Sequence, residues 1–210
     1  MAARILLIGD SHTRNMSLAF SKYLPSTPVY TLTMPQGIEE IAHKYHTNRT
    51  QITNFHPTIV IIHAGHNDIV FHHRHNNHPR NPQIVIDQIF QLMNEVLLDH
   101  PGIMPCVSSI FPRTSTLRSY LPESAIIPYN KKVKRHGQNL MTITRNTSIT
   151  CLVNNCLWHR ISSATENANY FDIDGLHLST KGKEAVVREW LTLIFPDMTF
   201  PELTQDSDQE

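Results

Sequence analysis

The fold is decided by the stretch ILLIGDSH, residues 5–12, in which four apolar residues run directly into a glycine and three polar residues. Such a run is typical of a buried strand that ends in a turn. Similar apolar runs recur along the chain, separated by helical patterns, so the strands are predicted to form a parallel sheet. The predicted strands are residues 4–9, 29–32, 58–62, 104–110 and 149–153.

Helical patterns fill the intervals between these strands. The clearest covers residues 82–98, where Asn81 can cap the first turn, Pro82 suits its start, and apolar residues recur at helical spacing. The alternation predicts an α/β fold, a three-layer α/β/α sandwich around a flavodoxin-like, doubly wound parallel sheet of about five strands. The other predicted helices are residues 13–23, 38–46, 128–141 and 180–194.

Length and charge narrow the class of protein. A chain of 210 residues is expected to form one domain, which we place at residues 1–195, followed by a polar, acidic and mobile tail at residues 196–210. Lys and Arg together number 18 and balance 18 Asp and Glu. No overall charge therefore draws the protein to nucleic acid or to an acidic membrane. The isolated domain is predicted to be monomeric.

Nothing in the sequence predicts membrane insertion or secretion. The longest apolar runs have four residues, whereas a membrane-spanning helix needs about 20. The first residues lack the apolar stretch and cleavage site of a signal peptide. Three cysteines are too few for a disulfide framework. These features together predict a cytoplasmic protein.

Chemically versatile residues follow the predicted strands, at the sheet edge where α/β proteins bind ligands. They are Ser11, Gly37 and Asn67 after the first three strands, and Asp174 and His177 before the last helix. A serine hydrolase needs a hydroxyl nucleophile, an imidazole base, a carboxylate that orients the base, and donors for the oxyanion. Taken singly, each motif is more typical of a turn or a helix cap. Their combination at one edge favours catalysis.

The motifs GDSH (9–12), GHND (65–68) and DGLH (174–177) resemble the SGNH subgroup of the GDSL esterases and lipases. The resemblance covers residues 4 to about 194 and implies an ester hydrolase with an α/β/α fold. Aspartate three residues before histidine also suits a carboxylate that orients the imidazole. The roles that the resemblance implies are nucleophile for Ser11, base for His177, orienting acid for Asp174, and oxyanion hole for Ser11, Gly37 and Asn67.

Two blocks resemble, more narrowly, the esterase domain in the first open-reading-frame proteins of some animal LINE retrotransposons. They are GDSHT, residues 9–13, and DGLHLSTKG, residues 174–182. The first block contains His12, which stands where the wider family has leucine. This resemblance implies a domain of a larger RNA-binding protein, a ribonucleoprotein setting, and short-chain acyl esters or lipids as substrates.

One dense basic run lies within the helix predicted at residues 128–141. A solvated helix face is the usual role of such a run, and contact with anionic lipid headgroups or RNA phosphates is the alternative. The run consists of Lys131, Lys132, Lys134 and Arg135.

A histidine-rich run follows the third predicted strand. Neither cysteine nor a Glu-x-x-His pattern accompanies it, so it is predicted to be a loop rather than a metal site. Its members are His72, His73, His75 and His78.

The sequence as a whole predicts a serine esterase that hydrolyses carboxylic esters of short acyl groups, or lipids, through an acyl-enzyme. It predicts neither a metal nor an organic cofactor. Two alternatives stay open. One is a lipid- or RNA-binding module of a retrotransposon ribonucleoprotein in which catalysis is dispensable, and the other is a carbohydrate acetylesterase.

Overall fold

A five-stranded parallel sheet forms the centre of the molecule. The computed structural model describes residues 2–69, 82–108, 110, 111, 131, 157–159, 170–174 and 177–201. The strand order, β2-β1-β3-β4-β5, is the flavodoxin-like order, so the predicted fold class is confirmed. The strands are β1 (Ile5–Gly9), β2 (Val29–Thr33), β3 (Ile59–His63), β4 (Met104–Ser108) and β5 (Leu157–His159).

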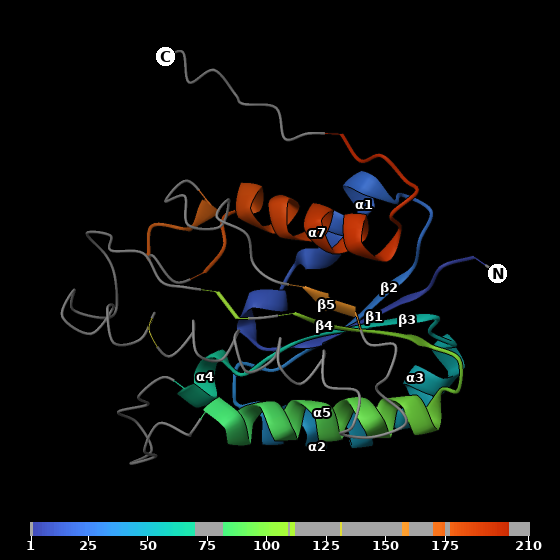
Figure 1. The fold of residues 1–210 in the computed structure, drawn as a ribbon, viewed down its shortest axis with the longest axis vertical. Coiled ribbons are helices and arrows are strands. Elements are labelled where there is room, and N and C mark those ends of the chain that lie inside the picture. The colour runs from blue at the N-terminus through green and yellow to red at the C-terminus, as the bar shows by residue number, and fades with distance from the viewer. Residues whose placement is uncertain are drawn as a thin grey trace.

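Helices cover both faces of this sheet (Figure 1). α1 and α7 lie on one face, and α2 and α5 lie on the other. The helices are α1 (Met16–Tyr23), α2 (Ile38–Thr47), α3 (Arg49–Phe55), α4 (His66–Ile69), α5 (Pro82–Asp99) and α7 (Thr180–Ile194), with a 3-10 turn, η1 (Ser11–Thr13).

The first strand, β1, is apolar because both of its faces are buried. Successive side chains of a strand point to opposite faces. Leu6 and Ile8 belong to the core on the side of α2 and α5, whereas Ile5 and Leu7 belong to the core on the side of α1 and α7. Because helices cover both faces, no position of β1 is free to be polar.

The first predicted helix, residues 13–23, begins later than its pattern suggests. Asn15 has a left-handed backbone with φ of 61°, and α1 starts only after it, at Met16. The residues before Asn15 form η1, whose amino end is capped by Asp10. A residue in the left-handed region interrupts a right-handed helix, which accounts for the displaced boundary.

Other boundaries differ by less, and some predictions fall outside the described residues. β4 ends at Ser108, so the strand predicted at residues 104–110 is too long. α3 and α4 are short and were not predicted, because neither shows a sustained apolar period. The fifth strand is β5, while the strand predicted at residues 149–153 lies outside the described residues. The helix predicted at residues 128–141 also lies outside the described residues, except for Lys131.

The described part of the chain extends to Pro201, beyond the end of the predicted domain. Phe200 is buried, and its ring lies edge-on to that of Tyr23, with centroids 6.2 Å apart. Residues 202–210 lie outside the described residues. Within the described ranges, no helix combines the length and apolar character needed to cross a membrane.

Candidate active site

Three predicted residues meet at the carboxyl edge of the sheet. The Ser11 Oγ and His177 Nε2 atoms are 3.3 Å apart, and His177 Nδ1 lies 2.7 Å from Asp174 Oδ2. Ser11 follows β1, while the other two residues lie on the loop before α7. All three side chains are partly buried. The sheet thus brings together residues that are 166 positions apart in the sequence.

The two contacts of His177 specify its tautomer. An ionised carboxylate can only accept hydrogen bonds, and a neutral imidazole carries one N–H. Nδ1 therefore donates to Asp174, which leaves Nε2 as an acceptor for the Ser11 hydroxyl. The second oxygen of Asp174 accepts from the backbone N–H of His177 at 2.9 Å. Both carboxylate oxygens are thus committed to one residue, and the ring is held in a single orientation.

The loop that carries Asp174 and His177 is anchored at both ends. Phe171 and Leu178 form an antiparallel bridge. The Asp172 N–H donates to the His177 carbonyl at 2.8 Å, next to this bridge. Ser179 then caps α7 by accepting from the Gly182 N–H at 3.1 Å. The acid and base therefore stand on a braced loop rather than on a free one.

The turn that presents Ser11 is held in place by hydrogen bonds to the Asp10 carboxylate. One oxygen of this carboxylate accepts from the His12 N–H at 3.1 Å, and the other accepts from the His66 N–H at 3.3 Å. Asp10 thereby ties the end of β1 to the start of α4. Gly9, just before it, must be glycine, because a Cβ there would lie 2.3 Å from the His63 carbonyl oxygen.

Burial makes Asp10 an unusual carboxyl group. Its side chain is fully buried, and this burial raises its pKa to about 7. The N–H donors of His12 and His66 oppose the rise, and the nearby Asp68 adds to it. A buried carboxyl whose partners are backbone N–H groups lacks the full stabilisation that a cation would give its charge.

The loop after β2 is clamped by α4. Asn67 Nδ2 donates to the Pro35 carbonyl at 2.7 Å, with the Gln36 carbonyl 3.3 Å away. One oxygen of Asp68 accepts from the Ile38 N–H at 3.0 Å. A Cβ on Gly37 would lie 2.4 Å from the other Asp68 oxygen, so a larger residue there would displace this carboxylate. The structure thus brings Gly37 and Asn67 to the edge where Ser11 lies, with the Asn67 amide directed to the neighbouring loop.

Histidine rings pack behind the Ser11 turn. His12, His63 and His66 are all buried. The His12 ring centroid lies 4.5 Å from that of His66 and 5.4 Å from that of Phe111. The Trp190 indole N–H on α7 donates to Ser108 Oγ at 3.1 Å, and this oxygen lies 3.3 Å from His63 Nδ1. The cluster joins three strand ends to α7.

Two further predictions concern residues that the structure describes only in part. The histidine-rich run at residues 72–78 lies outside the described residues, and of the basic run only Lys131 is described. In the described part of the chain, no three His, Cys, Asp or Glu side chains are grouped in a way that could hold a metal ion.

Comparison with solved structures identifies the fold around this site. A GDSL-like lipase from Bacteroides thetaiotaomicron has a TM-score of 0.63 and 15% sequence identity, over 92% of this chain and 86% of that chain. The chain has the fold of the GDSL lipases. Within this GDSL-lipase fold, a lipase/acylhydrolase from Enterococcus faecalis has a TM-score of 0.58 and 16% identity, over 96% of this chain and 100% of that chain.

The GDSL-lipase fold also includes an acyl-transferring domain. The catalytic domain of peptidoglycan O-acetyltransferase A from Streptococcus pneumoniae has a TM-score of 0.59 and 16% identity, over 96% of this chain and 97% of that chain. No protein-family model matches the sequence, and no curated protein matches it.

No role was predicted for Asp10 or Asp68, although they lie within the GDSH and GHND motifs. Their contacts reach His66 and Ile38, which are 56 and 30 positions away. Such contacts leave no local pattern in the sequence. The available signal was chemical: an aspartate placed directly after an apolar strand is expected to be buried, and a buried carboxyl group must find donors.

Proposed function

We propose that the protein is a serine ester hydrolase. The observation that carries this proposal is the line of contacts from Ser11 Oγ to His177 Nε2 and from His177 Nδ1 to Asp174. The GDSL-lipase fold, which places this line at the carboxyl edge of the sheet, supports it. Nucleophilic acyl transfer needs such an arrangement, because the hydroxyl must lose its proton as it attacks.

The reaction proceeds through an acyl-enzyme. Ser11 Oγ attacks the acyl carbonyl carbon while its proton passes to His177 Nε2, and Asp174 stabilises the resulting imidazolium. The tetrahedral intermediate collapses, the ester C–O bond breaks, and the alcohol leaves with the proton from His177. Water then gives a proton to His177 and attacks the acyl carbon. Collapse of this second intermediate releases the carboxylic acid and restores Ser11.

The oxyanion is stabilised by donors from three strand ends. We assign the backbone N–H groups of Ser11 and Gly37 and the side-chain amide of Asn67 to this task. The Asn67 amide donates to the Pro35 carbonyl and, over a longer distance, to the Gln36 carbonyl. We propose that it exchanges the Gln36 contact for the oxyanion while the Pro35 contact continues to brace the loop. Loss of one such donor typically lowers the rate by about 10² to 10³.

The substrate class that we propose is a carboxylic ester with a short acyl group. An acetyl xylan esterase has the same fold, with a TM-score of 0.61 and 12% identity, as do lipases and acylhydrolases. The two sequence blocks described above further suggest a retrotransposon ribonucleoprotein in the cytoplasm, with lipids as substrates. A carbohydrate acetylesterase is the alternative.

Hydrolysis of p-nitrophenyl acetate, butyrate and octanoate by wild type and Ser11→Ala tests the proposal, with chelator in all assays. We expect turnover that falls with chain length, ignores chelator and is lost in Ser11→Ala. Ser21→Ala is the matched control, because Ser21 lies exposed on α1. A sulfonyl fluoride should label Ser11, detected by mass spectrometry.

Equal rates in wild type and Ser11→Ala would refute the proposal. They would favour the binding module instead. Flotation with anionic liposomes and RNA-binding assays would then test that module, with Lys131, Lys132, Lys134 and Arg135 as the candidate surface.

A further inference from the structure

His12 contacts the proposed base, although the mechanism above gives it no task. Its side chain is 1% exposed. The centroids of the His12 and His177 rings are 5.5 Å apart, and the ring planes are inclined by 38°. The residue lies directly after the proposed nucleophile, so the turn that presents Ser11 also places this second imidazole beside the base.

The His12 ring is held on several sides. It lies edge-on to His66 at 4.5 Å, to Phe111 at 5.4 Å and to His63 at 6.0 Å between centroids. The backbone N–H of His12 donates to the buried carboxylate of Asp10. A side chain that is packed and tied in this way cannot turn away from its neighbour without disturbing the turn. The contact with His177 is therefore a fixed feature of the site.

We propose that His12 is a positioning residue whose ring holds His177 in its catalytic orientation and stabilises the imidazolium that forms when His177 takes the Ser11 proton. This inference rests on the proposed function. It concerns a position where the sequence departs from the leucine of the family that it resembles. A leucine could fill the space but could not offer an aromatic ring.

The expected effect follows from the interaction of a cation with an aromatic ring. A cation within about 6 Å of a Trp, Tyr or Phe ring is attracted to it by an amount that corresponds to a rate change of about 2- to 30-fold, and we apply this range to the imidazole of His12. His177 is neutral before the reaction and charged in the transition state. The attraction therefore acts mainly on the transition state, which lowers the barrier rather than the KM.

Several titratable groups share this environment. Asp174 from the loop before α7 faces His177, and Asp10 from the end of β1 lies next to His12. His63 from β3 and His66 from α4 contact the His12 ring. A pH profile must therefore be compared between variants at position 12, because the other groups contribute equally to each of them.

Two substitutions distinguish the effect of the aromatic ring at position 12 from the effect of side-chain volume. His12→Leu keeps an apolar side chain of similar size and removes the ring. His12→Phe keeps an aromatic ring and removes its nitrogens. The measurements are kcat and KM for p-nitrophenyl acetate across pH, with circular dichroism and urea unfolding to confirm the fold. If the leucine variant does not fold, His12→Met replaces it, because methionine adapts to irregular space.

We expect His12→Leu to lower kcat by about 2- to 30-fold with KM nearly unchanged. The acidic limb of the kcat–pH profile of His12→Leu should move to lower pH, because the His177 imidazolium is less stabilised in this variant. His12→Phe should stay close to wild type. Wild-type kcat and pH profile in the leucine variant would overturn the inference. So would a phenylalanine variant as slow as the leucine variant, or an acidic limb that moves to higher pH.

A second measurement distinguishes failure of this inference from failure of the proposed function. In a Ser11→Ala background, NMR follows the titration of the His177 imidazole with His12 or with Leu at position 12. We expect the midpoint to fall in the leucine variant, and an unchanged midpoint would overturn the inference. Full turnover by Ser11→Ala would instead overturn the proposed function. The NMR comparison would still show whether the His12 ring stabilises the His177 imidazolium.

Discussion

At the carboxyl edge of the sheet polar side chains are buried together, whereas at the amino edge the buried Tyr45 and the largely buried Asp99 side chain meet side chains that are exposed to solvent. Tyr45 aside, every buried polar residue of the described chain lies at or just after the end of β1, β3 or β4. These residues form the catalytic-edge cluster, which is Asp10, His12, Thr13, His63, His66, Asp68 and Ser108.

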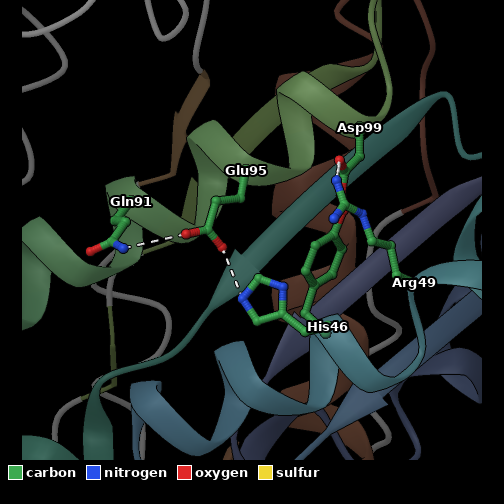
Figure 2. A network of polar contacts seen from close by, with 6 residues as sticks. His46, Arg49, Gln91, Glu95 and Asp99 are labelled. Atoms are coloured by element: carbon green, nitrogen blue, oxygen red, sulfur yellow. Dashed lines mark hydrogen bonds and ion pairs between the residues drawn. The ribbon is translucent and has the colours of Figure 1, made fainter.

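The contacts at the other edge form the amino-edge network (Figure 2). Arg49 forms an ion pair with Asp99, which also accepts from the Tyr45 hydroxyl at 2.8 Å. His46 lies 3.2 Å from Glu95. These contacts join α2 and α3 to the last turns of α5. The amino-edge network is Tyr45, His46, Arg49, Gln91, Glu95 and Asp99.

Two aspartates, one at each edge, differ in the groups that surround their charge. Burial raises the pKa of Asp10, whose partners are backbone N–H groups. Burial also opposes ionisation of Asp99, but hydrogen bonds from Arg49 and Tyr45, together with the Arg49 charge, hold its pKa below the usual value. A charge with a cation beside it stabilises the fold. A buried carboxylate held by N–H groups alone is tolerated where it fixes the geometry of a site. Changes at the amino edge should therefore affect stability and leave turnover unchanged, whereas changes at the carboxyl edge should affect turnover or the pH dependence of stability.

The largest effect is expected from Asp174→Asn. The amide would offer an N–H to Nδ1 of His177 and would favour the wrong tautomer, which lowers kcat by about 10⁴ in such triads. Stability should hardly change, because the side chain is partly exposed. Asp172→Asn on the same loop is the control and should keep wild-type kcat. A loss below tenfold in Asp174→Asn would contradict the proposed role of this carboxylate.

Asp10→Asn should change how stability depends on pH. The folded pKa of about 7 lies above the unfolded value near 3.8, so the folded state keeps its proton to higher pH. The contribution of Asp10 is therefore fully present below about pH 4 and is lost as pH rises to about 7, by up to roughly 4 kcal/mol. Asp10→Asn removes this slope.

Urea unfolding at several pH values from 4 to 8 measures this slope as the difference between wild type and variant. Asp87→Asn is the control, because Asp87 is exposed on α5. Parallel stability curves for wild type and Asp10→Asn would show that Asp10 does not titrate in this range.

Asp99→Ala should lower the free energy of unfolding by about 1–3 kcal/mol, because Tyr45 and Arg49 lose their shared acceptor. The value of kcat/KM should not change. Tyr45→Phe in the Asp99→Ala background should cost less than Tyr45→Phe alone, since the two groups are coupled. A change in kcat/KM of more than threefold would break the separation of the two edges.

The smallest effect is expected from Glu95→Gln. Its partner His46 is half exposed, and exposed ion pairs contribute about 0–1 kcal/mol. The loss should shrink further in high salt, because salt screens surface charges. Thermal unfolding at low and high salt measures it. A large, salt-independent loss would place Glu95 among the buried determinants of the fold.

The sequence predicted those features that depend on nearby residues. The apolar runs of β1 and β3 revealed the sheet because both faces are covered, and the spacing of Asp174 and His177 is itself local. The start of α1 was missed because the left-handed Asn15 leaves no pattern in composition. The clamp of Asp68 on the Ile38 N–H was missed because it joins residues that are 30 positions apart in the sequence. The catalytic roles of the residues brought together here stay predictions.

The separation of Ser11 and His177 along the chain has a consequence for the order of synthesis. Ser11 leaves the ribosome 166 residues ahead of its partner imidazole. Their contact can close only after α7 has docked on α1, where Trp190 stacks on Phe20 at 6.1 Å and Lys22 pairs with Glu184 at 2.6 Å. A growing chain thus carries a hydroxyl without its base until α7 is in place. A fluorogenic ester added during translation would time that final step.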